Sequence, residues 1–286
     1  MGEMYSVDRL SRFLRAMALL TLVSPACAFG QGAKPDAKLP VRIEPAAQKL
    51  IDQTIAALGG KAFLGIKTVT SSGRLYYISQ GQTAGIFPFT SELEYPDKSR
   101  VTLSMATSSA AWIFLNGPEG DTVASKRPVV LINNGTQAWE LDRNGVDDQP
   151  SEEVRSWQIT NRYSLENLLR LRIHEPGALV QEGGLDFVEN RPVRVLKFYD
   201  TLGAQVTLDI NQDSDLPLRI TIRDLNAKTG RWEEFAHVFS DYQKIQGIET
   251  PMEVTAFYNG RRVSEFFCNT VSYNPTYPAS DFEAHE

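Results

Sequence analysis

The stretch DYQKIQGIETPMEVTAFYNGRRVSEFF, residues 241–267, predicts two antiparallel strands joined by a tight turn at Asn259-Gly260. Asn-Gly suits a two-residue hairpin turn because both central residues need a positive φ. Alternation places three apolar residues on one face of the first strand: Met252, Val254 and Ala256. Neighbouring aromatic residues follow in each strand, at Phe257-Tyr258 and Phe266-Phe267. Because neighbours in a strand point to opposite faces, this hairpin is apolar in places on both faces.

The composition is that of a globular protein. The chain has 286 residues, of which 42% are hydrophobic and 22% charged, with a formal net charge of -6. A sizeable core is therefore expected. Lys and Arg are scattered singly instead of clustered, so the sequence argues against a nucleic-acid partner.

Residues 1–30 have the pattern of an export signal. An apolar run, residues 16–23, lies between a basic segment and the small-residue pattern ACA at 26–28. The run is too short to span a bilayer, so we expect a removed signal peptide and a periplasmic or secreted protein. Lipid anchoring at Cys27 is the less favoured alternative, because Ser24 stands where lipoprotein signals usually carry Leu. We expect a flexible lead-in at 31–44 and a single domain at 45–286.

The order of periodic segments predicts mainly antiparallel β structure with a few helices. Apolar spacings of three and four predict a helix that begins at Pro45 and ends at Gly59-Gly60. Period-two segments fill residues 67–141 without an intervening helix, which excludes a parallel βαβ sheet. Helical signals return over 151–172, where Ser151 and Ser164 are candidate caps, and strands then continue to the end. About a dozen strands exceed what an open flat sheet sustains, so we expect the sheet to curve.

No known catalytic or metal-binding pattern is present in the sequence. The histidines His174, His237 and His285 are far apart, and each is expected on the surface or in a loop. Residues 209–215, DINQDSD, alternate oxygen ligands, but a calcium loop would need Gly and Glu where Ser214 and Ile220 stand. A polar turn is the preferred interpretation. We therefore expect no enzyme activity, no metal and no cofactor.

Cys268 is the only cysteine outside the expected signal peptide. An internal disulfide is then excluded from the exported chain. We expect Cys268 to be a buried small apolar residue and not a nucleophile.

Several segments carry a resemblance to the LolA-like periplasmic carriers of outer-membrane lipoproteins. They are AAQKLIDQTIAALGGKAFLGIKTVTSSGRL, NNGTQAWELDRNG, VTLDINQDSDLPLRITIRD, FSDYQKIQGIETPMEV and NPTYPASDF. The resemblance implies a strongly curved open half-barrel of about eleven strands, with helices covering the concave face. It also implies acyl chains held between sheet and helices, which explains a hairpin that is apolar on both faces.

The leading functional hypothesis is a non-enzymatic carrier of a lipid, a lipoprotein acyl chain or another apolar ligand. The partners would be a lipid or an acylated lipoprotein, and the carrier a monomer. Candidate cavity-lining residues are Trp112, Phe114, Leu131, Trp139, Leu208, Ile220, Phe235, Met252 and Val254. For each of them, plain core packing is the competing interpretation. The alternative function is a cell-envelope module that binds a protein partner and no lipid.

Overall fold

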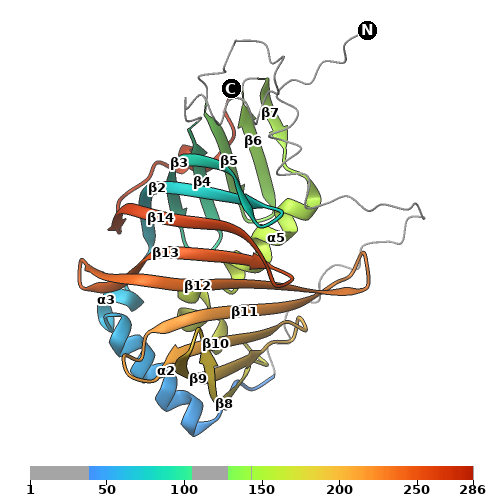
Figure 1. The fold of residues 1–286 in the computed structure, drawn as a ribbon. Coiled ribbons are helices and arrows are strands. Elements are labelled where there is room, and N and C mark those ends of the chain that lie inside the picture. The colour runs from blue at the N-terminus through green and yellow to red at the C-terminus, as the bar shows by residue number, and fades with distance from the viewer. Residues whose placement is uncertain (1–38, 105–127, 143, 286) are drawn as a thin grey trace.

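The structure is a computed structural model that describes residues 39–104, 128–142 and 144–285 (Figure 1). Its described α-helices lie on one side of a large sheet. The α-helices are α2 (Pro45–Leu58), α3 (Lys61–Leu64), α5 (Ser151–Arg162) and α6 (Leu165–Arg170). Two short 3-10 helices are η1 (Arg172–His174) and η2 (Ala279–Phe282).

The described residues form one sheet of fourteen strands. The strands before the central helices are β1 (Arg42–Ile43), β2 (Thr68–Ser79), β3 (Gln82–Glu94), β4 (Lys98–Leu103), β5 (Val129–Asn134), β6 (Gln137–Asp142) and β7 (Gly145–Asp148). Those after them are β8 (Leu179–Val188), β9 (Arg191–Tyr199), β10 (Gln205–Asn211), β11 (Pro217–Asn226), β12 (Arg231–Ile245), β13 (Ile248–Tyr258) and β14 (Arg261–Tyr273).

Two antiparallel meanders are joined side by side in this sheet. The strand order is β1-β8-β9-β10-β11-β12-β13-β14-β2-β3-β4-β5-β6-β7, so β14 pairs with β2 and the sheet stays open between β1 and β7. The predicted antiparallel class is confirmed, whereas the predicted count of about eleven strands is wrong. Short β1 and β7 and the glycine-interrupted β8 carry too little period-two signal to be found in the sequence.

The pairing of β1 is the exception to the antiparallel pattern. Arg42 and Ile43 pair in parallel with Leu179 and Val180 of β8. These two residues belong to the segment 31–44 that was expected to be a flexible lead-in, and the structure places them in the sheet.

Helix α2 forms where the apolar spacing predicts it. Its buried positions include Ala47, Leu50 and Leu58, and Gly59 ends it with a φ of 122°. A Cβ on Gly59 would lie 2.4 Å from the carbonyl oxygen of Gly247, so the helix end packs closely on the β12–β13 turn. Glycine satisfies both the backbone angle and the close approach.

The predicted turn at Asn259-Gly260 is confirmed, with Asn259 at φ 48° and Gly260 at φ 74° between β13 and β14. The prediction of only two strands in residues 241–267 is wrong, because residues 241–245 end β12, which turns into β13 at Gln246-Gly247. Phe266 lies on the inner face of the sheet and packs against the buried cluster of Phe87, Phe89 and Leu103. Phe267 is 37% exposed on the opposite face and packs edge-on against Tyr76, with ring centroids 5.2 Å apart. The adjacent aromatic residues therefore serve two different faces of β14.

The main core lies between the helices and the strands β8–β13, and it includes Ile51, Leu168, Phe198 and Ile222. It extends to Val69 at the start of β2 and Tyr273 at the end of β14. Each large apolar side chain buried there contributes about 1.5–3 kcal/mol gross. No helix in the described part of the chain is long and apolar enough to cross a membrane.

Candidate functional site

A second apolar cluster lies on the same face of the sheet as the main core, separate from it. We call it the apolar wall: Phe87, Phe89 and Leu103 are buried, and Leu75, Tyr77, Val101, Phe266 and Cys268 are partly buried around them. The register of strands β14, β2 and β3 aligns Phe266, Leu75 and Phe87 on one face. Burial raises the pKa of the Cys268 thiol, which agrees with its expected role as a small apolar residue. Five of these eight side chains are only partly buried, whereas most side chains of the main core are buried.

Glycine 73 shapes the middle of the wall. It pairs with Cys268 on one side and Phe89 on the other, so it faces the wall without filling it. A Cβ on Gly73 would lie 1.9 Å from the carbonyl oxygen of Phe267, which shows that β2 and β14 approach closely here. Such a glycine in a strand marks a close backbone approach.

Helix α5 crosses this face of the sheet, and none of its residues is buried. Arg155 near its start pairs with Glu233 on β12, and the Gln158 amide donates to the carbonyl oxygen of Gly135 in the β5–β6 turn at 3.1 Å. These two residues are separated by a rise of only about 4.5 Å along the helix. In a flat sheet, β12 and β5 would be about 28 Å apart, because six strand spacings separate them. The sheet must therefore bend around α5.

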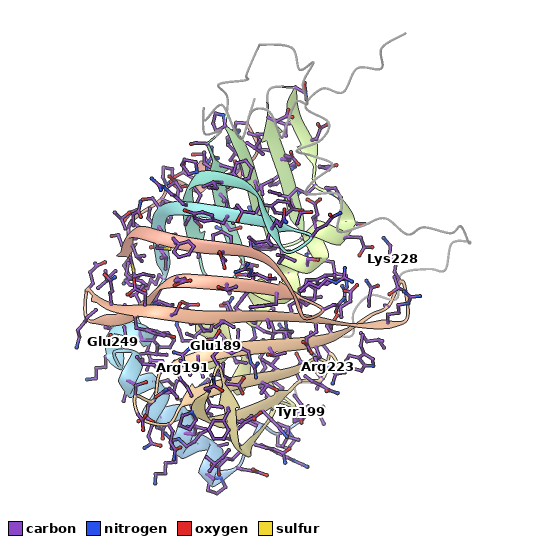
Figure 2. The ribbon with its side chains drawn as sticks, viewed as in Figure 1. Glu189, Arg191, Tyr199, Arg223, Lys228 and Glu249 are labelled. Carbon is purple, nitrogen blue, oxygen red and sulfur yellow. The ribbon has the colours of Figure 1, made fainter. Side chains whose placement is uncertain are left out.

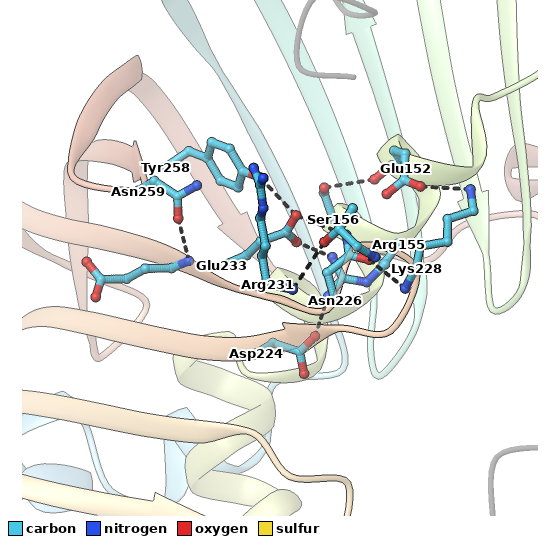
Figure 3. Close-up of polar contacts among 12 residues, drawn as sticks. Glu152, Arg155, Ser156, Asp224, Asn226, Lys228, Arg231, Glu233, Tyr258 and Asn259 are labelled. Carbon is cyan, nitrogen blue, oxygen red and sulfur yellow. Dashed lines mark hydrogen bonds and ion pairs between the residues drawn. The ribbon is translucent and has the colours of Figure 1, made fainter. Parts of the chain in front are cut away.

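An ionic latch holds the N-terminal part of α5; it consists of Arg155, Asp224 and Glu233 (Figure 3). The Arg155 guanidinium bonds both carboxylates, and the three side chains are 23%, 20% and 14% exposed. The Tyr258 hydroxyl and the Asn226 amide donate to Glu233 at 3.1 and 2.9 Å. Burial raises the pKa of Asp224 even though Arg155 lowers it.

The C-terminal part of α5 is held by other contacts. The Asn161 amide donates to the carbonyl oxygen of Pro96, in the β3–β4 turn, at 2.8 Å. Arg162 pairs with Glu175, and the Tyr163 hydroxyl donates to Asp200. Polar contacts thus hold α5 at both ends, while apolar burial along its length is incomplete.

His237 is a polar residue on the otherwise apolar inner face, where it pairs with Ile220 of β11 and Ala256 of β13. It was expected on the surface or in a loop, and this is wrong, because it lies half-buried in the middle of β12. Desolvation lowers its pKa to about 4, so the imidazole is neutral at pH 7. A neutral imidazole there offers one hydrogen-bond donor and one acceptor.

A groove of about 530 Å³ lies where the ends of β2 and β3 meet α6 and the segment after β14. Arg170 and Tyr95 line it, with the guanidinium 5.4 Å from the ring centroid. Next to them, burial raises the pKa of the Glu166 carboxyl, to which Tyr95 is hydrogen-bonded. This partly buried carboxyl group lies at the edge of the main core and apart from the wall.

The predicted cavity-lining residues occupy several different places. Leu208, Ile220 and Phe235 are buried within the main core. Val254 packs against that core and pairs with Phe266 of the wall, while Met252 is buried two residues earlier on β13.

The remaining predicted residues are divided between faces. Leu131 pairs with Val101 of the wall, whereas Trp139 pairs with Ile132 and therefore points to the opposite face. Trp112 and Phe114 lie outside the described residues.

The sequence reading missed Phe87 and Phe89 as site residues, although their alternation around Pro88 was a usable signal. The ionic latch had no such signal, because its partners are 69 and 78 residues apart in the chain.

The polar turn at 209–215 is confirmed. The Asn211 side-chain oxygen accepts from the backbone N–H groups of Asp213 and Ser214, each at 2.9 Å. This is the geometry of an Asx turn. The Asn211 side-chain oxygen thus stabilises the β10–β11 connection.

No protein-family model matches the chain, and no curated protein matches it. Among solved structures, a LolA superfamily protein, NE2245 from Nitrosomonas europaea, is similar with a TM-score of 0.50 and 12% identity. That match covers 82% of this chain and 96% of the other. A putative outer membrane lipoprotein-sorting protein domain from Vibrio parahaemolyticus also has a TM-score of 0.50, with 10% identity, covering 83% of this chain and 97% of the other. The open, curved antiparallel sheet with helices on its inner side is a LolA-like fold.

Proposed function

We propose that the protein is an exported, non-enzymatic carrier that holds a lipid, a lipoprotein acyl chain or another apolar ligand between the sheet and helix α5. The observation that carries this proposal is the apolar wall, in which five of eight side chains are only partly buried although they share a face with the core. Incomplete burial of α5 on the same face supports it. Apolar surface of this kind favours an apolar occupant.

The energetics of an acyl chain fit such a site. About fifteen buried methylenes would contribute about 12 kcal/mol gross. Association costs are about 4–15 kcal/mol. Affinity should therefore rise with chain length, and no specific hydrogen bond to the ligand is required.

The proposed ligand contacts are the wall residues together with two of the residues predicted from the sequence, Leu131 and Val254. Both are paired across strands with wall residues, Val101 and Phe266 respectively. Leu208 and Ile220 have no exposed surface to offer a ligand without a rearrangement of the main core.

The test begins with protein purified without detergent, extracted with organic solvent and examined by mass spectrometry. Stripped protein is then titrated with a fluorescent fatty acid. Phe266→Ala should weaken uptake, whereas Phe267→Ala should not, because these neighbours point to opposite faces of β14. Thermal unfolding of both variants checks that they are folded.

Absence of co-purifying lipid together with absence of fatty-acid uptake would refute the carrier function. It would favour an envelope module that binds a protein partner. Equal loss of uptake in the two variants would show that the wall is not the binding surface.

A further inference from the structure

Strand β8 leaves most of its outer edge unpaired within the described part of the chain. β1 covers only Leu179 and Val180, and from Gln181 onward no described strand pairs on that side. The chain approaches β1 past Gly177, whose N–H donates to the carbonyl oxygen of Leu39 at 3.2 Å. The segment that leads into β1 therefore lies at the start of β8, away from Leu185.

The backbone of the second half of β8 presents hydrogen-bonding groups outward. The register with β9 shifts at Gly183-Gly184, and Phe187 then lies opposite Pro192, which has no N–H to donate. The Phe187 N–H instead donates to the carboxylate of the preceding residue, Asp186, at 2.8 Å. By alternation, the N–H and C=O of Leu185 point outward as those of Phe187 do. An added strand could pair with these groups.

Two large apolar side chains stand beside this edge. Leu185 is 72% exposed and Phe187 68%, the highest values among the large apolar residues in the described ranges. They share one face, whereas Asp186 between them points to the other. Their face also carries Arg194, which donates to Gln53 of α2 at 2.9 Å.

The charge along the edge is negative. Glu182 and Asp186 are exposed, and the Glu44 carboxylate lies there too, accepting from the Glu182 N–H at 3.2 Å. The two nearby arginines form ion pairs with other carboxylates. Arg191 pairs with Glu189 at the β8–β9 turn, and both residues are labelled in Figure 2. Arg194 pairs with Asp215. Lys197, next to Gly183, offsets only part of this negative charge.

We propose that the outer edge of β8, from Leu185 to Val188, is a docking site for an extended segment of a partner protein in which apolar and basic residues alternate. The segment would add as a strand through the outward groups of Leu185 and Phe187. Its apolar residues would cover those two side chains, and its basic residues would lie beside Asp186 on the opposite face. This is strand addition to an exposed sheet edge.

Two other occupants fit less well. A second copy of β8 would bring like-charged carboxylates together across the new ladder, which is destabilising. An anionic membrane surface would be repelled by the same carboxylates. The proposal goes beyond the lipid-carrier function and does not depend on it.

The test uses a fluorescein-labelled peptide of alternating Lys and Val residues and a control peptide with Glu in place of Lys, titrated against the purified protein by anisotropy. The Lys peptide should bind and the Glu peptide should not. Leu185→Ser with Phe187→Ser should weaken binding by about tenfold or more, because both apolar contacts are lost. Leu225→Ser is the matched control: it removes an exposed apolar residue, 48% exposed, from β11, and should leave binding unchanged.

Two further measurements locate the interaction. Asp186→Asn should weaken binding of the Lys peptide by several-fold and reduce its salt dependence, because a charge contact is lost. Hydrogen exchange should show slower exchange of the Leu185 and Phe187 amides when the peptide is bound. Failure of the Lys peptide to bind, equal binding of the Glu peptide, or unprotected Leu185 and Phe187 amides in the complex would each overturn the proposal.

Two further measurements distinguish a partner segment from a second copy of this chain and from a membrane surface. Concentration-dependent dimerisation that the Leu185→Ser, Phe187→Ser variant abolishes would assign the edge to a second copy. Vesicles of phosphatidylcholine and phosphatidylglycerol that bind the wild type but not this variant would assign it to lipid. Either result overturns the proposal.

Discussion

Replacing Arg155 by Met tests whether the ionic latch fixes α5 to the sheet. The change removes the guanidinium between Asp224 and Glu233 and keeps most of the aliphatic stem. Two carboxylates, 20% and 14% exposed, are then left facing each other without a cation. Breaking a fully buried pair costs about 3–5 kcal/mol, and an exposed pair is worth about 0–1 kcal/mol. At this intermediate burial we expect the free energy of unfolding to fall by about 1–3 kcal/mol at pH 7.

The pH dependence makes this prediction specific. Arg155 lowers the pKa of Asp224, whereas burial and Glu233 raise it. Without Arg155, the folded-state pKa of Asp224 rises further above its unfolded value. The folded variant then binds more protons than the unfolded chain, so its stability increases as the pH falls from 7 to 5. Urea unfolding of wild type and variant at both pH values measures the difference between them, which should shrink on acidification.

A matched control is Arg262→Met, which breaks the Arg262–Glu265 pair at 2.6 Å on the β14 side of the hairpin. That arginine is 45% exposed, so the loss should stay within about 1 kcal/mol. An Arg155→Met variant that behaves like this control, or whose deficit is the same at pH 7 and pH 5, would refute the latch.

Three further predictions concern the interior of the sheet. His237→Gln should lose less stability than wild type on acidification. The folded-state pKa of His237, about 4, makes the wild type lose stability as the pH falls from about 6.5 toward 4. Urea titrations of both proteins at pH 7 and 5 would show equal losses of stability if the imidazole were already solvated. Leu208→Ala should lower the free energy of unfolding by about 2–5 kcal/mol, whereas the exposed Leu225→Ala should change it little; similar denaturation midpoints for both would contradict the assignment of Leu208 to the core. Gly73→Ala should cost about 1–3 kcal/mol, because its Cβ would meet the backbone of Phe267, and a thermal unfolding midpoint equal to wild type would show that β2 and β14 can separate there.

Local signals were enough to predict several of the individual elements. Helix α2 follows from its apolar spacing, from Pro45 and from Gly59, all within one segment of chain. The β13–β14 hairpin follows from Asn259-Gly260, since few residues other than these accept the required positive φ. The Asx turn after β10 follows from Asn211 in the same way. Each of these depends on residues that are close together in the sequence.

The assignment of faces needed the tertiary structure. A period of two tells which residues of a strand share a face, but it does not tell which face is inner when both carry apolar residues. Leu131 and Trp139 were therefore predicted together and lie on opposite faces. Leu208 was predicted to line a cavity and is buried in the core, because helices α2 and α6 cover its part of the sheet and leave the apolar wall partly open.

The sequence alone was sufficient for the antiparallel class, the opening helix and the tight turns, because each is decided by interactions between near neighbours in the chain. Only the folded chain decided how far the sheet bends and where its apolar surface stays open. That geometry depends on contacts such as Arg155 with Glu233 and Gln158 with Gly135. Such contacts join segments that are far apart in the sequence, so no local sequence pattern indicates them. The side chains involved meet their partners only when the strands between them have curved.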